Sequence, residues 1–265
     1  MRGLPGGGRL GLTGLLLVAV LSLIFKQDFF SLLGGVDDGS GSGAPGASAP
    51  ATTSPEENTR YEFVKFVIND TQDTWTSLLP KATGVAYERS TLVLFRDTVD
   101  SACGGADAAS GPFYCPGDHK VYIDLSFYDE LKTRFGAGGD FAQAYVIAHE
   151  IGHHVQNLLG LDRQMRDQQR ARPSSANAQS VKLELQADCL AGVWGHSTAQ
   201  RQILEDGDVE SGLNAAAAIG DDRIQRMSGR SVQPDAFTHG SSAQRVAAFR
   251  QGLETGDLAS CGISR

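Results

Sequence analysis

A nearly apolar segment from Asp140 to Leu159 contains the sequence HEIGH at residues 149–153. Its apolar neighbours, among them Tyr145–Ile147 and Val155, predict a helix that is buried on most sides. Residues four apart lie on one face of a helix, so His149 and His153 can bind the same metal ion. Glu150 is turned by about 100° around the axis, where it can serve as a general base. Buried histidines also need partners, which favours a metal site over two surface histidines.

A third ligand is expected from a second apolar segment, LELQADCLAG at residues 183–192. A third histidine downstream of HEIGH is excluded, because Gln156 and Leu159 occupy the positions that such a pattern needs as Gly and His. Glu184 and Asp188 are four residues apart and share a helix face. We expect Glu184 to bind one Zn²⁺ per chain together with the two histidines. Asp188 is then expected to accept the other ring N–H of a ligand histidine.

The stretch THGSSAQR at residues 238–245 allows two interpretations. In the first, Ser241 or Ser242 caps a final helix and Arg245 makes a salt bridge, so the segment is a turn and a cap. In the second, His239 lies in a catalytic cleft and donates a hydrogen bond to an oxyanion. The sequence supports the two interpretations about equally.

Hydrophobic spacing predicts the remaining elements. Strands are expected at Thr91–Phe95 and Lys120–Leu125, with a Gly- and Pro-rich loop between them and an edge on the second strand where an extended peptide could add. Asp140 is the expected N-cap and Gly160 the expected C-cap of the HEIGH helix. Gly152 and Gly192 are expected to let the two central helices approach. The expected helices are one ending at Pro80, Asp140–Leu159, residues 177–196, residues 208–227 and Ser242–Leu253.

Strands precede most of the helices in this order, which predicts an α+β fold with a small N-terminal sheet and a mostly helical C-terminal part. The four cysteines are even in number and allow two disulfides, in any of three pairings, or buried free thiols. Cys103 with Cys115 is the short local choice, which leaves Cys189 with Cys261. A zinc site made of these cysteines is not expected, because no C-x-x-C spacing is present.

Residues 1–33 are interpreted as an N-terminal membrane segment. Leu10–Phe25 is almost uninterrupted in its apolar character, Arg2 and Arg9 precede it, and no small-x-small cleavage site follows. An uncleaved anchor is favoured, while a cleaved signal peptide and a soluble N-terminal helix are the alternatives. The arginines favour a cytoplasmic N-terminus, so the protein is expected in the cell membrane as a single-pass protein, or else secreted or periplasmic. In each of these cases the bulk of the chain lies outside the cytoplasm.

Residues 34–59 are rich in Gly, Ser, Ala and Pro and are interpreted as a flexible linker, which leaves residues 60–265 as the folded domain. The net charge of −8 and the absence of a basic stripe exclude an electrostatic nucleic-acid binder. The expected partners are a peptide or protein substrate and, through the N-terminal segment, a membrane.

Four segments together resemble the bacterial neutral zinc metallopeptidases: SACG…GPFYCPGDHKVYIDLSF, AYVIAHEIGHHVQ, LELQADCLAGVW and THGSSAQR, in that order. The resemblance covers about residues 60–265. It implies a zincin-type fold with His149, His153 and Glu184 as zinc ligands and Glu150 as the base. It adds little on the substrate.

The predicted function is hydrolysis of peptide bonds by a zinc-activated water with Glu150 as general base. The alternative is a non-catalytic, zinc-stabilised envelope protein that scaffolds or binds partners. Glu150 favours catalysis, because a structural zinc site needs no base and usually has four protein ligands.

Overall fold

The computed structural model describes residues 55–107 and 111–263. They form a mostly helical α+β fold with two small sheets, which confirms the predicted fold class. The predicted membrane segment and all of the linker up to residue 54 lie outside these residues, so both stay predictions. A search of the described helices finds none that is long and apolar enough to cross a membrane.

In chain order the helices and strands have the following bounds. They are α2 (Pro55–Thr83), β1 (Thr91–Phe95), β2 (Thr98–Ser101), β3 (Gly104–Asp107), β4 (Phe113–Cys115), β5 (Lys120–Asp124), α3 (Phe127–Thr133), α4 (Asp140–Leu158), α5 (Leu161–Ala171), α6 (Ala176–Gln200), α7 (Asp208–Ala218), α8 (Asp221–Met227) and α9 (Ser242–Thr255).

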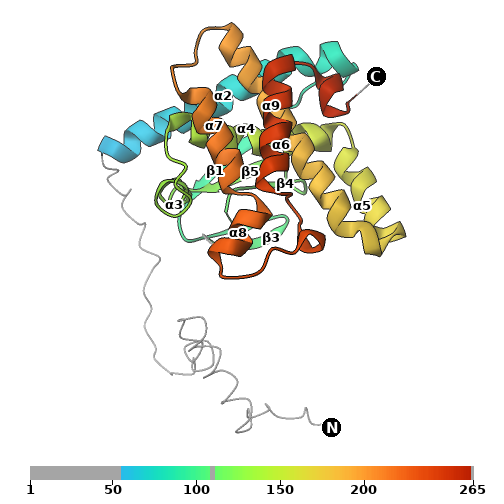
Figure 1. The fold of residues 1–265 in the computed structure, drawn as a ribbon. Helices are drawn as coiled ribbons and strands as arrows, with labels where there is room; N and C mark the ends of the chain where they lie inside the picture. The colour runs from blue at the N-terminus through green and yellow to red at the C-terminus, as the bar shows by residue number, and fades with distance from the viewer. Residues whose placement is uncertain (1–54, 108–110, 264–265) are drawn as a thin grey trace, which may run out of the picture. The chain divides into compact units, whose positions relative to one another are not determined.

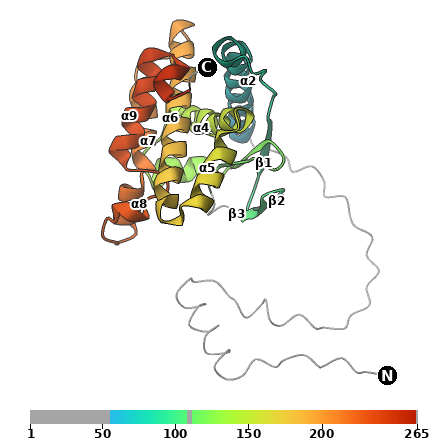
Figure 2. The same cartoon turned by 90° about the vertical axis from the view of Figure 1, so that its right-hand side faces the viewer.

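Helix α4, which contains HEIGH, lies in the middle of the described fold (Figures 1 and 2). It contacts α6 and α7 on one side, α2 on the other, and also α5 and β4. Its side chains Tyr145, Ile147, Ile151 and Val155 have no exposed surface. Neighbouring elements surround this helix, and this agrees with its sequence, which is apolar on nearly all sides.

Two glycines allow the close helix contacts that hold the fold together. A Cβ at Gly152 of α4 would lie 2.9 Å from the backbone oxygen of Ala187 in α6. Gly192 of α6 faces α9 instead, where a Cβ would lie 2.1 Å from the oxygen of Phe249. The expectation that both glycines lie between the same two helices is therefore correct for Gly152 and wrong for Gly192.

The larger sheet has the strand order β1-β5-β4, with β1 and β5 parallel and β4 antiparallel to β5. β5 is therefore central, and the prediction that its edge is open to a peptide is wrong. The stretch expected to be a loop between β1 and β5 contains β4 and the separate β2–β3 hairpin. β4, at the edge of the sheet, contacts α4.

Several helix boundaries differ from the prediction. α2 passes through Pro80 and ends at Thr83, because a proline in the last turn removes only one helical hydrogen bond. It begins at Pro55, so residues 55–59 of the predicted linker are helical. Gly139, with φ 120°, is the N-cap of α4, and Asp140 is its first helical residue. Helix 208–227 is broken at Gly220, where a Cβ would lie 2.3 Å from the backbone nitrogen of Ser242.

Both disulfides favoured by the spacing are present, Cys103–Cys115 and Cys189–Cys261. The first joins the turn of the β2–β3 hairpin to the end of β4. The second spans 72 residues and attaches the segment after α9 to the middle of α6. Cys189 directly follows Asp188, so this crosslink lies next to the predicted metal centre.

Candidate metal centre

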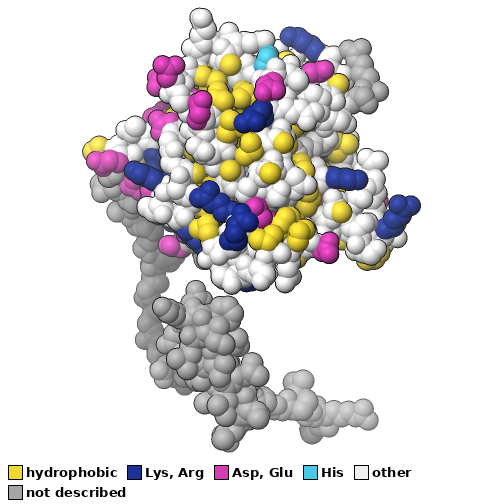
Figure 3. All heavy atoms as spheres, viewed as in Figure 1, with side chains coloured by type: hydrophobic (Ala, Val, Ile, Leu, Met, Phe, Trp, Pro, Cys, Tyr) yellow, Lys and Arg dark blue, Asp and Glu magenta, His cyan; other side chains and the backbone are white. Residues whose placement is uncertain are grey.

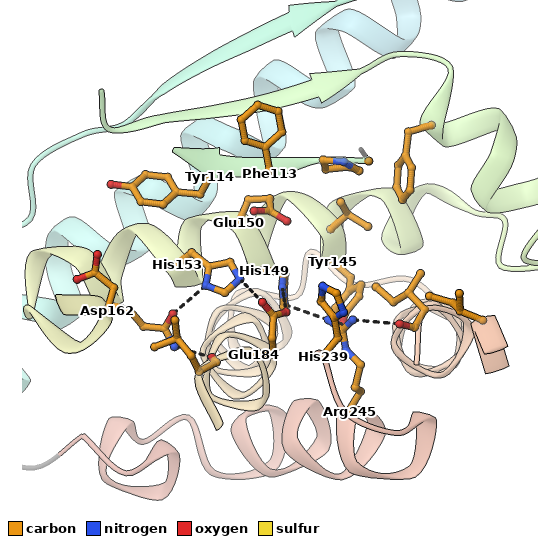
Figure 4. Close-up of a pocket in the computed structure, with 18 of the residues that line it drawn as sticks. Phe113, Tyr114, Tyr145, His149, Glu150, His153, Asp162, Glu184, His239 and Arg245 are labelled. Atoms are coloured by element: carbon orange, nitrogen blue, oxygen red, sulfur yellow. Dashed lines mark hydrogen bonds and ion pairs between the residues drawn. The ribbon is translucent and has the colours of Figure 1, made fainter. Parts of the chain in front are cut away.

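The structure brings His149, His153 and Glu184 together where α4 crosses α6 (Figure 4). The Nε2 atom of His149 lies 3.3 Å from Oε2 of Glu184, and Nε2 of His153 lies 3.4 Å from Oε1. One ligand atom from each of the three residues lies within 4.8 Å of the other two. Two nitrogens and a carboxylate with this spacing form a candidate metal site.

These contacts fit a single zinc ion. Ligand atoms bound at 2.0–2.1 Å to one tetrahedral zinc are separated by about 3.3–3.4 Å, and each histidine Nε2 lies at this separation from one of the two carboxylate oxygens of Glu184. Two imidazoles and a carboxylate are also a donor set that zinc uses in catalytic sites. The residues present therefore fit the metal.

Helix α6 also supplies the residue that orients His149. The Nδ1 atom of His149 lies 2.8 Å from Oδ1 of Asp188, which is fully buried. A carboxylate only accepts, so Nδ1 donates its hydrogen to Asp188 and Nε2 is the ring nitrogen that faces Glu184. Asp188 therefore lies where the spacing of Glu184 and Asp188 predicts it.

A buried arginine neutralises Asp188. Arg245 of α9 donates from Nε to Oδ2 at 2.8 Å and from Nη2 to Oδ1 at 2.9 Å, and the hydroxyl of Tyr145 donates to the same carboxylate. Arg245 is only 2% exposed. The salt bridge that the sequence suggests for Arg245 is thus part of the support of the metal centre.

Gln156 orients the second histidine. Its Oε1 lies 2.8 Å from Nδ1 of His153, while its Nε2 donates to the backbone oxygen of Leu183 at 2.7 Å. The second contact fixes which way the amide points, so Nδ1 of His153 is the donor and Nε2 is free. In both imidazoles Nδ1 is thus engaged by a second residue, so Nε2 is the ring nitrogen directed toward Glu184.

The charges of the cluster are strongly coupled. Burial by itself lowers the pKa of His149, but Asp188 and Glu184 raise it to about 10. The pKa of His153 is also raised, since Glu184 outweighs the effect of burial. Despite burial, the two imidazoles hold the pKa of Glu184 well below its usual range. The protein groups alone therefore bind protons where a metal ion would bind.

Zinc binding is accordingly expected to release protons. The raised pKa of His149 favours the protonated imidazole in the metal-free chain, and Nε2 has to give up that proton to become a ligand. Zinc affinity should fall as the pH falls. Calorimetric zinc titrations in buffers of different ionisation enthalpy measure this release, and an enthalpy independent of the buffer would contradict it.

Glu150 lies on another side of α4, between the histidines and β4 (Figure 4). It borders a cavity of about 590 Å³ together with Phe113, Tyr114 and the three metal-binding candidates. Among the described residues, none forms a hydrogen bond or ion pair with its carboxylate. Glu150 is thus a carboxylate beside the metal cluster, facing a cavity that can admit a ligand.

His239 lies at the border of the same cavity, with its side chain half exposed. Asp221 holds it, since Oδ1 lies 3.2 Å from the His239 Nδ1 and Oδ2 accepts the backbone N–H groups of Thr238, His239 and Gly240. The hydrogen bond that Asp221 accepts from its ring raises the pKa of His239. Ser241 forms a capping box with Gln244 at the start of α9. Both features inferred from the sequence, a cap and a histidine at the cleft, are therefore present.

Comparison with known proteins places the chain in a family. The family described as "Putative neutral zinc metallopeptidase" matches residues 2–263. The chain belongs to this family. A protein of Escherichia coli (strain K12) named Uncharacterized protein YpfJ is 52% identical over 209 residues, which are 78% of this chain and 72% of the relative. Uncharacterized protein Rv2575 of Mycobacterium tuberculosis (strain H37Rv) is 44% identical over 204 residues, 73% of this chain and 67% of the relative. No solved structure matches the chain.

Membership of this zinc metallopeptidase family agrees with the donor set of the cluster. Sequence reasoning did not assign roles to Tyr145, Gln156 and Asp221. A signal existed for two of them: Tyr145 is one turn before His149 and Gln156 is three residues after His153, so each shares a helix face with its histidine. Asp221 is remote from His239 in sequence and has no such local signal.

Proposed function

We propose that this chain is a zinc metalloendopeptidase of zincin-like architecture that hydrolyses peptide bonds. One observation supports this above all. The cluster has three candidate protein ligands among the described residues, His149, His153 and Glu184. Beside it, the carboxylate of Glu150 faces the cavity and has no hydrogen bond or ion pair with any described residue. Structural zinc sites are usually closed by four protein ligands, whereas catalytic sites have three and leave a position for water or substrate.

In the proposed reaction the protein side chains have separate roles. His149, His153 and Glu184 would hold one Zn²⁺, which when bound lowers the pKa of a water toward about 7 and polarises a carbonyl. Glu150 accepts a proton from the water that attacks the scissile carbonyl and later gives it to the leaving amine. Asp188 and Gln156 hold the imidazoles in the required tautomer. His239, held by Asp221, is proposed to donate a hydrogen bond to the oxyanion.

We further propose that the protein works outside the cytoplasm, attached to the cell membrane by residues 1–33. Two disulfides are typical of proteins in oxidising compartments, which supports a location outside the cytoplasm. The membrane segment itself rests on the amino-acid sequence alone.

Cleavage of a mixed peptide library by the full-length protein tests the proposed activity. We expect cleavage with one bound zinc, loss of cleavage after treatment with a chelator, and recovery when zinc is added back. A zinc-loaded protein that cleaves no peptide would instead favour the non-catalytic, zinc-stabilised envelope protein.

A further inference from the structure

One end of the cavity is lined by apolar side chains. Phe127 of α3, Phe135 of the following loop, Val146 of α4, and Ile219 and Ile224 around the start of α8 all border it. We call these five residues the apolar lobe. Val146 precedes His149 on α4, so the lobe lies toward the N-terminal end of that helix, away from Gln156 and Asp162 at the other end of the cavity.

The apolar lobe is not fully covered by the protein itself. Phe135, Ile219 and Ile224 are only partly buried, although each borders the cavity next to the metal cluster. Exposed apolar surface next to a few polar groups is common in ligand-binding sites, because a ligand that covers this surface removes it from water, which is favourable. An apolar ligand group is therefore the occupant that fits these walls.

Two charged side chains that border the cavity beside the lobe, Glu130 and Arg134, pair with each other. Arg134 lies 3.6 Å from Glu130, and its guanidinium is 5.4 Å from the centre of the Phe135 ring. Both charged side chains are substantially exposed. A charged substrate group inside the lobe would lose its hydration without gaining a buried partner among the described lobe residues, which is unfavourable.

The walls of the lobe are held at a fixed separation. Arg223 of α8 donates from Nη2 to the backbone oxygen of Phe135 at 2.6 Å, which joins α8 to the loop after α3. At the start of α8, Asp222 accepts hydrogen bonds from the backbone N–H and the hydroxyl of Ser242, at 2.7 and 2.8 Å. Ile224 and Phe135 therefore belong to a preformed site, and binding needs little ordering of the protein.

We infer that the apolar lobe binds one bulky apolar side chain of the substrate, such as Leu, Ile, Met or Phe, at one fixed position relative to the cleaved bond. This inference rests on the proposed function, and it adds the substrate class: polypeptide segments with such a residue beside the cleavage site. A single methylene in a hydrophobic pocket is worth about 10–200-fold in kcat/KM, so we expect a preference of at least about that size over Asp or Lys at the same position.

Ile224→Asp tests the lobe, and Met227→Asp is its matched control. Met227 is on the same helix, is 44% exposed and does not border the cavity. The outer surface around α8, in the lower middle of Figure 3, shows basic and apolar side chains side by side, so one added carboxylate there is tolerable. Both variants should bind zinc as the wild type does. Only Ile224→Asp should lower kcat/KM for a peptide with Leu at the preferred position, by about 10–200-fold.

A binding measurement separates this inference from the proposed activity. Peptides that differ only in one central residue (Leu, Phe, Asp or Lys) are titrated into the full-length Glu150→Gln protein, alone and combined with Ile224→Asp or Met227→Asp. We expect Leu and Phe peptides to bind most tightly, and only Ile224→Asp to remove that preference. Equal binding of all four peptides, or equal effects of the two substitutions, overturns the inference. If the wild type cleaves nothing, the proposed activity fails, while these binding constants still decide whether the lobe selects apolar side chains.

Discussion

Replacing Glu150 by Gln is expected to lower kcat for peptide hydrolysis by about 10²–10⁴-fold while zinc binding is retained. The amide has nearly the same shape as the carboxylate, but it cannot accept the proton of the attacking water. Glu150 is not one of the three clustered ligand candidates, and no described residue depends on its carboxylate for a hydrogen bond or ion pair. The fold and the metal site should therefore be preserved. Steady-state kinetics together with elemental analysis of zinc measure both effects.

Two further variants make the result for Glu150 specific. Glu184→Ala removes a carboxylate that faces both histidines, so it should lower the zinc content as well as the activity. Glu254→Gln, on the exposed side of α9, should change neither. If Glu150→Gln retains full activity, Glu150 is not the base. If Glu184→Ala retains all its zinc, Glu184 is not a ligand.

The second large effect is expected from Asp188→Asn. The substitution leaves the guanidinium of Arg245, 2% exposed, without its buried counter-charge. Breaking a buried ion pair from one side typically lowers the free energy of unfolding by about 3–5 kcal/mol. The variant also loses the charge that holds the His149 ring N–H, so zinc affinity should fall by about 10–100-fold. Urea denaturation of the metal-free protein and zinc titration measure the two effects separately.

An exposed aspartate–arginine pair provides the matched comparison. Asp73 lies 2.6 Å from Arg89, with both side chains largely in solvent, so Asp73→Asn should lower the free energy of unfolding by at most about 1 kcal/mol. Adding Arg245→Met to Asp188→Asn removes the unpaired charge and should recover part of the lost stability. If Asp73→Asn and Asp188→Asn lower the free energy of unfolding equally, the buried ion pair contributes no more to stability than the exposed one.

The sequence predicts the centre of the site well because the residues that form it are close together in the sequence. His149, Glu150 and His153 lie within two turns of one helix, and Glu184 and Asp188 within two turns of another, so helical periodicity alone determines which side chains share a face. That the two helices meet at these positions does not follow from periodicity. It follows from the cost of burying unpaired histidines and acids.

The contacts that sequence reasoning missed are those between distant parts of the chain. Arg245 meets Asp188 across 57 positions, and Asp221 meets His239 across 18. The position of Arg245 just after a helix cap predicts a salt bridge, but the sequence does not indicate which acidic residue is its partner. The short strand β4 was missed for a related reason: its three residues pair with β5 in the middle of a Gly- and Pro-rich stretch, where local propensity indicates a loop.

The contact between Gly152 and Ala187 limits how the HEIGH segment can vary in evolution. The obstacle to a side chain at position 152 is backbone, since a Cβ there would lie 2.9 Å from the Ala187 oxygen and 3.1 Å from its Cα. No compensating change of side chain in α6 can therefore make room. Any larger residue would push α6 away and carry Glu184 with it. Among related sequences, position 152 should remain glycine even where other positions of the helix vary. It should also show no covariation with position 187. In this fold the informative pattern is therefore H-E-x-G-H rather than H-E-x-x-H.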